Sequence, residues 1–262
     1  EEADRSFKSL DLVLSSVSDY LARRDVTDNP SYQRVLSDRD THLMLKEKVS
    51  GLPQVDAVTM VDRDGKLIPF APRSVLRHVC DLYAAEGWEP VVAPELEFYL
   101  VARNPDPNEP LRPPIGRSGR AEAGRQAYSI DSVNEFDPLF EDIYDYCEKQ
   151  KLDIDTLIHE IGTGQMEINF LHGDALELAD STFLFKRTVR EAAFRHNMYA
   201  TFMAKPIADE PGSAMHIHQS VLSSATGDNL FSNPEGGPTK EFFHFIGGQQ
   251  RYLPHVMCML AP

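Results

Sequence analysis

The sequence contains little cysteine, and the few cysteines are irregularly spaced. They are Cys80, Cys147 and Cys258, in a chain of 262 residues. An odd number of widely separated cysteines argues against a disulfide framework, and the spacing does not match the paired ligands of a zinc site. We therefore expect a protein that works in a reducing compartment.

Positive charge is also scarce. Lysine and arginine together number 26, against 41 aspartates and glutamates, and the formal net charge is −15. This balance is a poor match for the phosphate backbone of nucleic acids, so we expect no nucleic-acid partner. An acidic protein that handles nucleotides needs local cations, which divalent metal ions supply. Plain solubility explains the charge equally well.

The sequence lacks an apolar run of the roughly 20 residues that a membrane helix needs, and no membrane contact is indicated for residues 67–262. Hydrophobic residues make up 42% of the chain, which is enough for a sizeable core. The length fits one large domain or two small ones. Because the chain begins at Glu1 rather than at a methionine, we expect it to be part of a longer protein.

The stretch around which the chain is organised is residues 93–100, Ala-Pro-Glu-Leu-Glu-Phe-Tyr-Leu. Its alternation of polar and apolar side chains predicts a β-strand. Alternation places Leu96 and Phe98 on one face, and Glu95 and Glu97 on the other. Because two carboxylates on one strand face repel each other, that face must be hydrated or must hold a cation.

Two later stretches repeat this design. Residues 165–170 place Glu167 on a polar face, between a glutamine and an asparagine, and residues 215–220 place His216 and His218 on one face. A further predicted strand ends in a carboxylate just upstream of the first of these stretches. If the strands lie in one sheet, their polar faces form one site. Its members are Glu95, Glu97, Glu160, Glu167, His216 and His218.

Such a site suits a divalent metal ion. Oxygen-rich ligand sets with a minority of imidazole favour Mg²⁺ or Mn²⁺ over Zn²⁺. Two such ions over a sheet are able to hold and activate phosphates. Each stretch taken alone is more typical of a solvated sheet face or a hydrated histidine pair. The combination of the three stretches is what favours a metal site.

Several short motifs follow one another in the order found in glutamine synthetases, and the chain resembles that family. The motifs are Pro94-Glu95-Leu96-Glu97-Phe98, His159-Glu160, Gly164-Gln165-Met166-Glu167, Met203-Ala204-Lys205-Pro206 and the segment from Gly212 to Ser220. They look most like the branch that joins glutamate to polyamines or other amines, the γ-glutamylpolyamine synthetase-like enzymes. The resemblance covers about residues 68–262.

The resemblance implies an ATP-dependent ligation of glutamate to ammonia or, more in keeping with that branch, to an amine or polyamine, through a γ-glutamyl phosphate. It also implies two Mg²⁺ or Mn²⁺ ions, a cytoplasmic location and a homo-oligomer. By position, the implied metal ligands are Glu95, Glu97, Glu160, Glu167 and His216. His218 and Ser220 are implied to contact ATP, and Gly212 lies in the segment whose backbone receives glutamate. No catalytic side chain is assigned.

The sequence departs from the family in two places. Pro211 stands where members that use ammonia usually have asparagine, which favours an amine as the second substrate. The chain also stops at Pro262, before a segment in which the family carries a further metal-binding glutamate and several arginines, and it lacks the family's first domain. We therefore expect an incomplete site, with turnover below about 1 s⁻¹.

Residues 1–66 do not resemble the start of a glutamine synthetase. Their pattern predicts an amphipathic helix over residues 4–26, a shorter helix over residues 41–49 and a hairpin over residues 55–68. This segment resembles the start of bacterial extracytoplasmic sensor domains of the Cache (PAS-like) type; a packing or oligomerisation element is the alternative. We predict two parts, residues 1–66 and 67–262, and leave open whether the chain is a fragment or a fusion.

Two other functions remain as alternatives: a non-catalytic ligand-binding sensor module, and a pseudoenzyme that binds metal and nucleotide without turnover. The ligase and the sensor differ at Glu97, which only the ligase needs for metal.

The fold class predicted for the second part is α+β. We expect a curved, mostly antiparallel sheet backed by helices, as in a glutamine synthetase catalytic domain. Helices are predicted over residues 72–86, 137–150, 174–196 and 240–259, and a strand over residues 199–205. The apolar stripe of the first helix, which includes Val79 and Leu82, is predicted to face inward.

Overall fold

The structure is a computed structural model that describes residues 23–24, 31, 34–35, 40–41, 71–104, 106 and 108–260, apart from the side chains of residues 258 and 259. The contacts divide the chain into two compact units, residues 1–75 and 76–262. In the first unit, Arg23 and Arg24 lie in a turn, so the helix predicted over residues 4–26 does not include them. The rest of that helix, the hairpin and most of the helix predicted over residues 41–49 lie outside the described residues. The division between residues 66 and 67 stays a prediction.

Helices and strands alternate irregularly along the described chain. In order they are α4 (Pro72–Ala85), β1 (Trp88–Ala102), α5 (Ile130–Asn134), α6 (Asp137–Gln150), β2 (Ile154–His159), β3 (Gln165–Phe170), β4 (Gly173–Asp174), α7 (Ala175–Arg195), β5 (Met198–Thr201), β6 (Met215–Ser223) and α8 (Lys240–Leu260). No helix in this part of the chain is both long and apolar enough to cross a bilayer.

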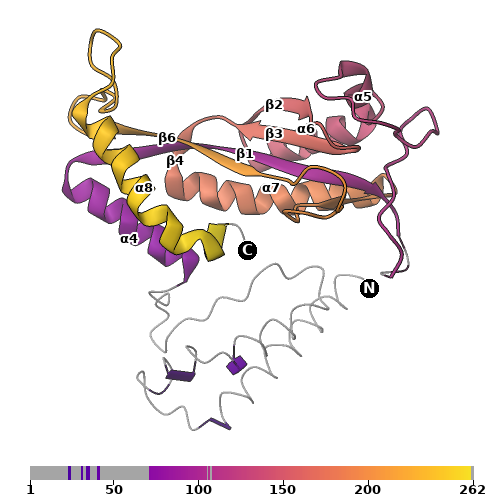
Figure 1. The fold of residues 1–262 in the computed structure, drawn as a ribbon, viewed down its shortest axis with the longest axis horizontal. Coiled ribbons are helices and arrows are strands. Elements are labelled where there is room, and N and C mark those ends of the chain that lie inside the picture. The colour runs from indigo at the N-terminus through magenta and orange to yellow at the C-terminus, as the bar shows by residue number, and fades with distance from the viewer. Residues whose placement is uncertain are drawn as a thin grey trace. The chain divides into compact units, whose positions relative to one another are not determined.

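Strand β1 runs along the middle of the sheet and pairs antiparallel with β3, β4, β5 and β6 (Figure 1). At Glu95 it pairs with both β3 and β6, so these two strands lie on opposite edges of β1. At Tyr99 it pairs with both β3 and β5, so β5 continues the edge occupied by β6. Strand β2 lies outside β3 and is also antiparallel. The α+β fold with an antiparallel sheet backed by helices is confirmed.

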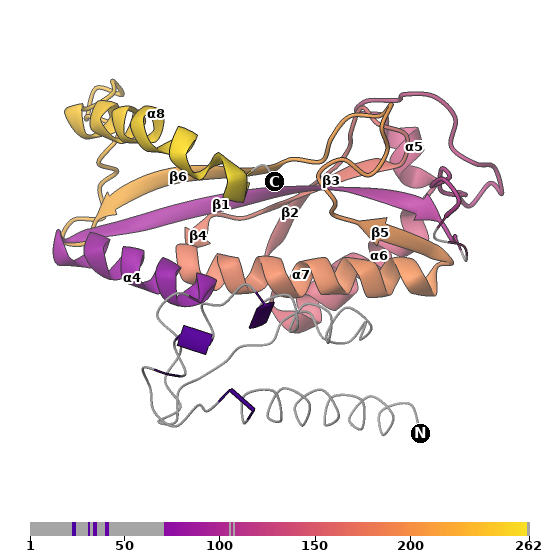
Figure 2. The ribbon, with the colours of Figure 1, turned by 60° about the horizontal axis from the view of Figure 1, so that its bottom comes forward.

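One face of the sheet is apolar and is covered by α6 and α7 (Figure 2). Leu96, Phe98 and Leu100 alternate along β1 and are all buried on this face. The rings of Phe170 on β3 and Phe185 on α7 meet edge to face, with centroids 5.1 Å apart. Burial of this face fixes the register of the sheet, because a slip by one residue exposes every apolar side chain.

Two predictions about the elements were wrong. Strand β5 ends at Thr201 rather than at residue 205, because the edge of β1 beyond Tyr99 is taken by the segment leading into β6. The N–H of Glu97 donates there to the carbonyl of Ala214 at 3.2 Å. The apolar stripe of α4 is not buried: Val79 is 40% exposed and Leu82 55% exposed.

Helix α7 begins where the sequence predicts, at an aspartate that caps it. The Asp174 carboxylate accepts hydrogen bonds from the N–H groups of Leu176 at 2.9 Å and Glu177 at 2.8 Å. These N–H groups have no partner inside the helix, and the negative charge also suits the helix dipole.

We predict that Asp174→Ala lowers the free energy of unfolding by about 1 kcal/mol, because two helix N–H groups lose their acceptor. Asp174→Asn keeps an acceptor oxygen and is the matched control, with a smaller loss. Urea unfolding followed by the fluorescence of Trp88, the one tryptophan of the chain, measures both. Equal stability of Asp174→Ala and the parent protein would contradict the prediction.

Candidate metal centre

The register of the sheet brings the predicted polar residues onto one face, opposite the core. Glu97 on β1 pairs directly with Glu167 on β3, and Glu95 pairs with Asn169 on one side and His216 on the other. Directly paired residues in an antiparallel sheet project from the same face. The three polar stretches of the sequence therefore do meet, and Glu95 lies between the other two strands.

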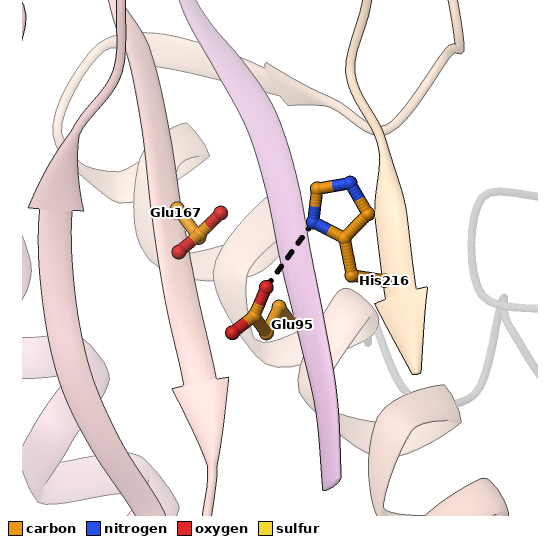
Figure 3. Close-up of side chains that lie close together, drawn as sticks. All are labelled: Glu95, Glu167 and His216. Atoms are coloured by element: carbon orange, nitrogen blue, oxygen red, sulfur yellow. Dashed lines mark hydrogen bonds and ion pairs between the residues drawn. The ribbon is translucent and has the colours of Figure 1, made fainter. Parts of the chain in front are cut away.

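Glu95, Glu167 and His216 form the tightest cluster on this face. Each offers one ligand atom, and these atoms all lie within 4.8 Å of one another. Figure 3 shows their side chains directed toward one another from three neighbouring strands. Glu167 is 6% exposed, whereas the side chain of His216 is 61% exposed. The cluster is thus closed on the β3 side and open to solvent on the β6 side.

Both histidines of β6 contact the same carboxylate. Nδ1 of His216 lies 3.1 Å from one oxygen of Glu95, and Nε2 of His218 lies 2.7 Å from the other. Partial burial opposes ionisation of Glu95, but His218 and His216 outweigh it and lower the pKa of this carboxyl. Glu95 is therefore ionised at neutral pH.

The neighbouring carboxyls are shifted the other way. Burial, followed by the negative charge of Glu97, raises the pKa of Glu160. Burial also raises the pKa of Glu167, and the charges of Glu95, Glu160 and Glu97 add to it, against a hydrogen bond from Asn169. Four carboxyls thus share one electrostatic environment, and a cation placed among them relieves their repulsion.

Glu97 and Glu160 lie outside the three-residue cluster but act on it electrostatically. Glu160 directly follows β2, and its N–H donates to the carbonyl of Gln165 at 2.8 Å. One oxygen of Glu97 accepts from Nε2 of Gln165 at 2.8 Å and from the N–H of Ala214 at 3.1 Å. The other oxygen of Glu97 has no hydrogen bond among the described residues and is available to a ligand.

The remaining predicted residues lie along β6 and just before it. Ser220 pairs with Val91, two positions along β6 from His218 and on the same face. Gly212 is exposed, and a Cβ there would lie 2.8 Å from the carbonyl oxygen of Ala204. Position 212 therefore excludes a side chain without local movement, which keeps the backbone of this turn accessible.

Two buried interactions behind the site were not predicted from the sequence. Gln165 lies on the predicted polar face, yet its 1% exposure and four hydrogen-bonding neighbours were not foreseen. Nε2 of His159 lies 2.8 Å from the carboxylate of Glu122 in the loop before α5. The alternation along β3 indicates that Gln165 shares a face with Glu167, whereas no sequence pattern links Glu122 with His159.

Tyr99 also belongs to this buried layer. Burial, together with the charges of Glu210 and Glu97, raises the pKa of its hydroxyl to about 12. The hydroxyl is therefore protonated at all physiological pH values, and it donates to the carbonyl of Pro211 at 2.7 Å.

The family described as glutamine synthetase, catalytic domain, matches residues 69–262. The chain belongs to the glutamine synthetase family. The match includes every residue of the face described above, and it leaves out nearly all of the first compact unit.

Individual relatives agree with this assignment. The gamma-glutamylputrescine synthetase of Escherichia coli K12 is 39% identical over 208 residues, which are 78% of this chain and 44% of that protein. A glutamate–isopropylamine ligase of Pseudomonas is 31% identical over 206 residues, 76% of this chain and 43% of that protein. The glutamine synthetase of Plasmodium falciparum superposes with a TM-score of 0.65 at 20% identity, over 76% of this chain and 43% of its own, and shows the shared fold. The chain thus spans less than half the length of these relatives.

Because the pKa of Glu167 is raised, we predict that its ionised carboxylate lowers the free energy of unfolding of the metal-free protein at high pH. The folded state binds the proton of Glu167 more tightly than the unfolded chain does, so ionisation above the folded pKa destabilises the fold. Glu167→Gln should therefore raise the free energy of unfolding at about pH 8 in a chelating buffer. The gain should shrink as the pH falls and should vanish below pH 4.5, the ordinary pKa of the carboxyl, where both states are protonated.

Urea unfolding across this pH range measures the gain. Glu141→Gln on the exposed side of α6 is the control with the same change of charge, and it should give no comparable gain. A loss of stability on Glu167→Gln at high pH would show that the carboxylate is already compensated by its neighbours.

Proposed function

We propose that the polar face of the sheet is the metal and nucleotide side of an ATP-dependent ligase that joins glutamate to an amine through a γ-glutamyl phosphate. The observation that carries the proposal is the convergence of Glu95, Glu167 and His216 in a chain of the glutamine synthetase family. The names of the relatives support an amine as the second substrate, since two of them are ligases of putrescine and isopropylamine.

The donor set fits a divalent cation. Carboxylate oxygens with one imidazole suit Mg²⁺ or Mn²⁺, and the like charges that raise the pKa values of Glu160 and Glu167 are what a cation offsets. In this proposal Glu97, Glu160 and Glu167 hold one ion, and Glu95 and His216 hold the second. Bound there, the ions neutralise phosphate charge and align the phosphoryl donor with the carboxylate that receives it.

The chain's own groups then bind and orient the substrates. His218 and Ser220 follow His216 along β6, on the same face, where the phosphates and the nucleoside of ATP would extend from the metal side. Gly212 lies in the turn on the other side of Glu97, where an accessible backbone offers hydrogen bonds to glutamate. In this proposal the γ-carboxylate of glutamate and the γ-phosphate of ATP meet at the carboxylate cluster. Proximity of this kind lowers the barrier to phosphoryl transfer.

Activation precedes amine attack because a free carboxylate is a poor electrophile. The γ-carboxylate oxygen of glutamate attacks the γ-phosphorus of ATP, and the bond from that phosphorus to the bridging oxygen of ADP breaks. The amine nitrogen then attacks the acyl carbon, phosphate leaves, and the amine loses a proton. We also propose a cytoplasmic homo-oligomer for the whole enzyme, on the strength of family membership.

We predict that Glu97→Gln weakens the binding of Mn²⁺ in the presence of ATP about tenfold, equivalent to about 1.4 kcal/mol. The substitution removes one charge from the cluster and keeps the size of the side chain. Glu89→Gln is the matched control: Glu89 is on the same face of β1, exposed, and roughly 20 Å from Glu95 by strand geometry. Isothermal titration calorimetry measures all three proteins.

The outcomes separate the candidate functions. Saturable binding that Glu97→Gln weakens and Glu89→Gln leaves intact supports the ligase site. Equal weakening by both substitutions would indicate a general effect of net charge. An absence of binding in the parent protein would contradict the metal site and favour the sensor alternative.

We also predict that ADP release from ATP and glutamate depends on the amine, with putrescine or isopropylamine giving faster release than ammonium at equal concentration. Pro211 in place of the asparagine of ammonia users is the sequence feature behind this order. A coupled assay of ADP formation measures it, with Glu97→Gln as the inactive control. Binding of Mn²⁺ and ATP without release in any amine would identify a pseudoenzyme instead.

A further inference from the structure

One buried amide lies where four segments of the chain meet behind the site. Gln165 begins β3, is 1% exposed and has hydrogen-bonding neighbours on every side. Its Nε2 donates to the Glu97 carboxylate at 2.8 Å and to the carbonyl of Gly212 at 3.0 Å. Its Oε1 accepts from the N–H of Gly162 at 3.0 Å and lies 3.2 Å from the hydroxyl of Tyr99.

The neighbours fix the orientation of this amide. A carboxylate and a carbonyl only accept, so the side facing Glu97 and Gly212 must be the NH₂ group. The N–H of Gly162 only donates, so the opposite side must be the oxygen. Nε2 donates twice and Oε1 accepts once, since the single proton of the Tyr99 hydroxyl goes to the carbonyl of Pro211. These three hydrogen bonds hold the amide in one orientation.

The residues around Gln165 are closely packed. A Cβ at Gly162 would lie 2.1 Å from the hydroxyl of Tyr99 and 2.7 Å from Oε1 of Gln165, so position 162 must lack a side chain. Tyr99 is fully buried, and its hydroxyl donates to the carbonyl of Pro211, one residue before Gly212. The N–H of Ala214 reaches the same oxygen of Glu97 that Gln165 holds. The turn at residues 211–214 is therefore held by Tyr99 at Pro211, by Gln165 at Gly212 and by Glu97 at Ala214.

We propose that Gln165 is a positioning residue that couples the Glu97 carboxylate to the backbone of residues 211–214, so that one buried side chain sets both the metal side and the glutamate side of the site. This rests on the proposed function, in which Glu97 binds metal and the turn binds glutamate. By holding one oxygen of Glu97, Gln165 directs the other toward the cluster. By holding the carbonyl of Gly212, it occupies an acceptor that would otherwise repel the carboxylates of glutamate.

The test removes the hydrogen bonds of Gln165 without adding charge. Gln165→Met keeps the length of the side chain and loses all four contacts. Gln150→Met is the matched control, because Nε2 of Gln150 also donates to two oxygens, of Tyr146 and Thr188, at the far end of α6. Gly162→Ala displaces the same amide while leaving residue 165 unchanged, and it decides the question if Gln165→Met does not fold.

Two readouts are taken on each protein: hydrogen exchange at the amide of Ala214, and calorimetric affinity for Mn²⁺. We expect Gln165→Met and Gly162→Ala to accelerate exchange at Ala214 at least tenfold and to weaken Mn²⁺ binding about tenfold. Exchange at Val189, in the middle of α7, should not change. Gln150→Met should leave the Ala214 exchange rate and the Mn²⁺ affinity within about twofold of the parent.

Unchanged exchange at Ala214 in folded Gln165→Met overturns the proposal. If exchange at Ala214 accelerates while the Mn²⁺ affinity is unchanged, Gln165 does not couple Glu97 to residues 211–214. Gln165 is then a structural residue only. If the parent protein binds no Mn²⁺, the proposed function fails instead, and exchange at Ala214 still decides whether Gln165 holds the turn against Glu97.

Discussion

The repulsion between carboxylates on one face of β1 is the constraint on which the rest of the structure depends. Glu95 and Glu97 project from that face two residues apart, and register adds Glu167 directly opposite Glu97. The protein compensates the two β1 carboxylates by different means. Glu95 has two imidazoles within hydrogen-bonding distance, whereas Glu97 has an amide and a backbone N–H. The arrangement leaves an excess of negative charge, which protonation of Glu160 or Glu167 or a bound cation would relieve.

The opposite face of the same strand explains why this excess is tolerated. Leu96, Phe98 and Leu100 alternate with the acidic residues and bury against α6 and α7. Hydrophobic burial of large side chains contributes on the order of 2 kcal/mol each, which is enough to hold an unfavourable polar face in register. Since the side-chain period of a strand is two residues, the core and the site cannot slip independently. The residues that stabilise the fold therefore also align the site.

Much of this arrangement follows from local sequence patterns, and the failures have physical causes. Alternation around Glu95, Glu167 and His216 predicted the strands and the shared polar face, and Asp174 marked the start of α7. The end of β5 was predicted wrongly because it depends on which segment pairs with β1 next to β5. That pairing is set by the tertiary structure and not by the local sequence. The exposed stripe of α4 was missed because amphipathicity reports a preference for burial and not the presence of a covering element. The pairing of Glu122 with His159 was invisible since it joins a loop to a strand end through side chains alone.

The buried layer between core and site shows why motif residues alone do not define a functional site. Glu97 is recognisable in sequence, but its orientation is set by Gln165, and the room for Gln165 and Tyr99 exists because position 162 has no side chain. A glutamate side chain has three rotatable bonds and would sample several positions on an open, charged sheet face. Two donors fix one of its oxygens before any ligand arrives. The conformational entropy of the side chain is therefore lost during folding rather than on binding. The geometry of the proposed ligand set thus depends on the packed layer beneath it, and we expect a change in that layer to alter binding without a change in any proposed ligand.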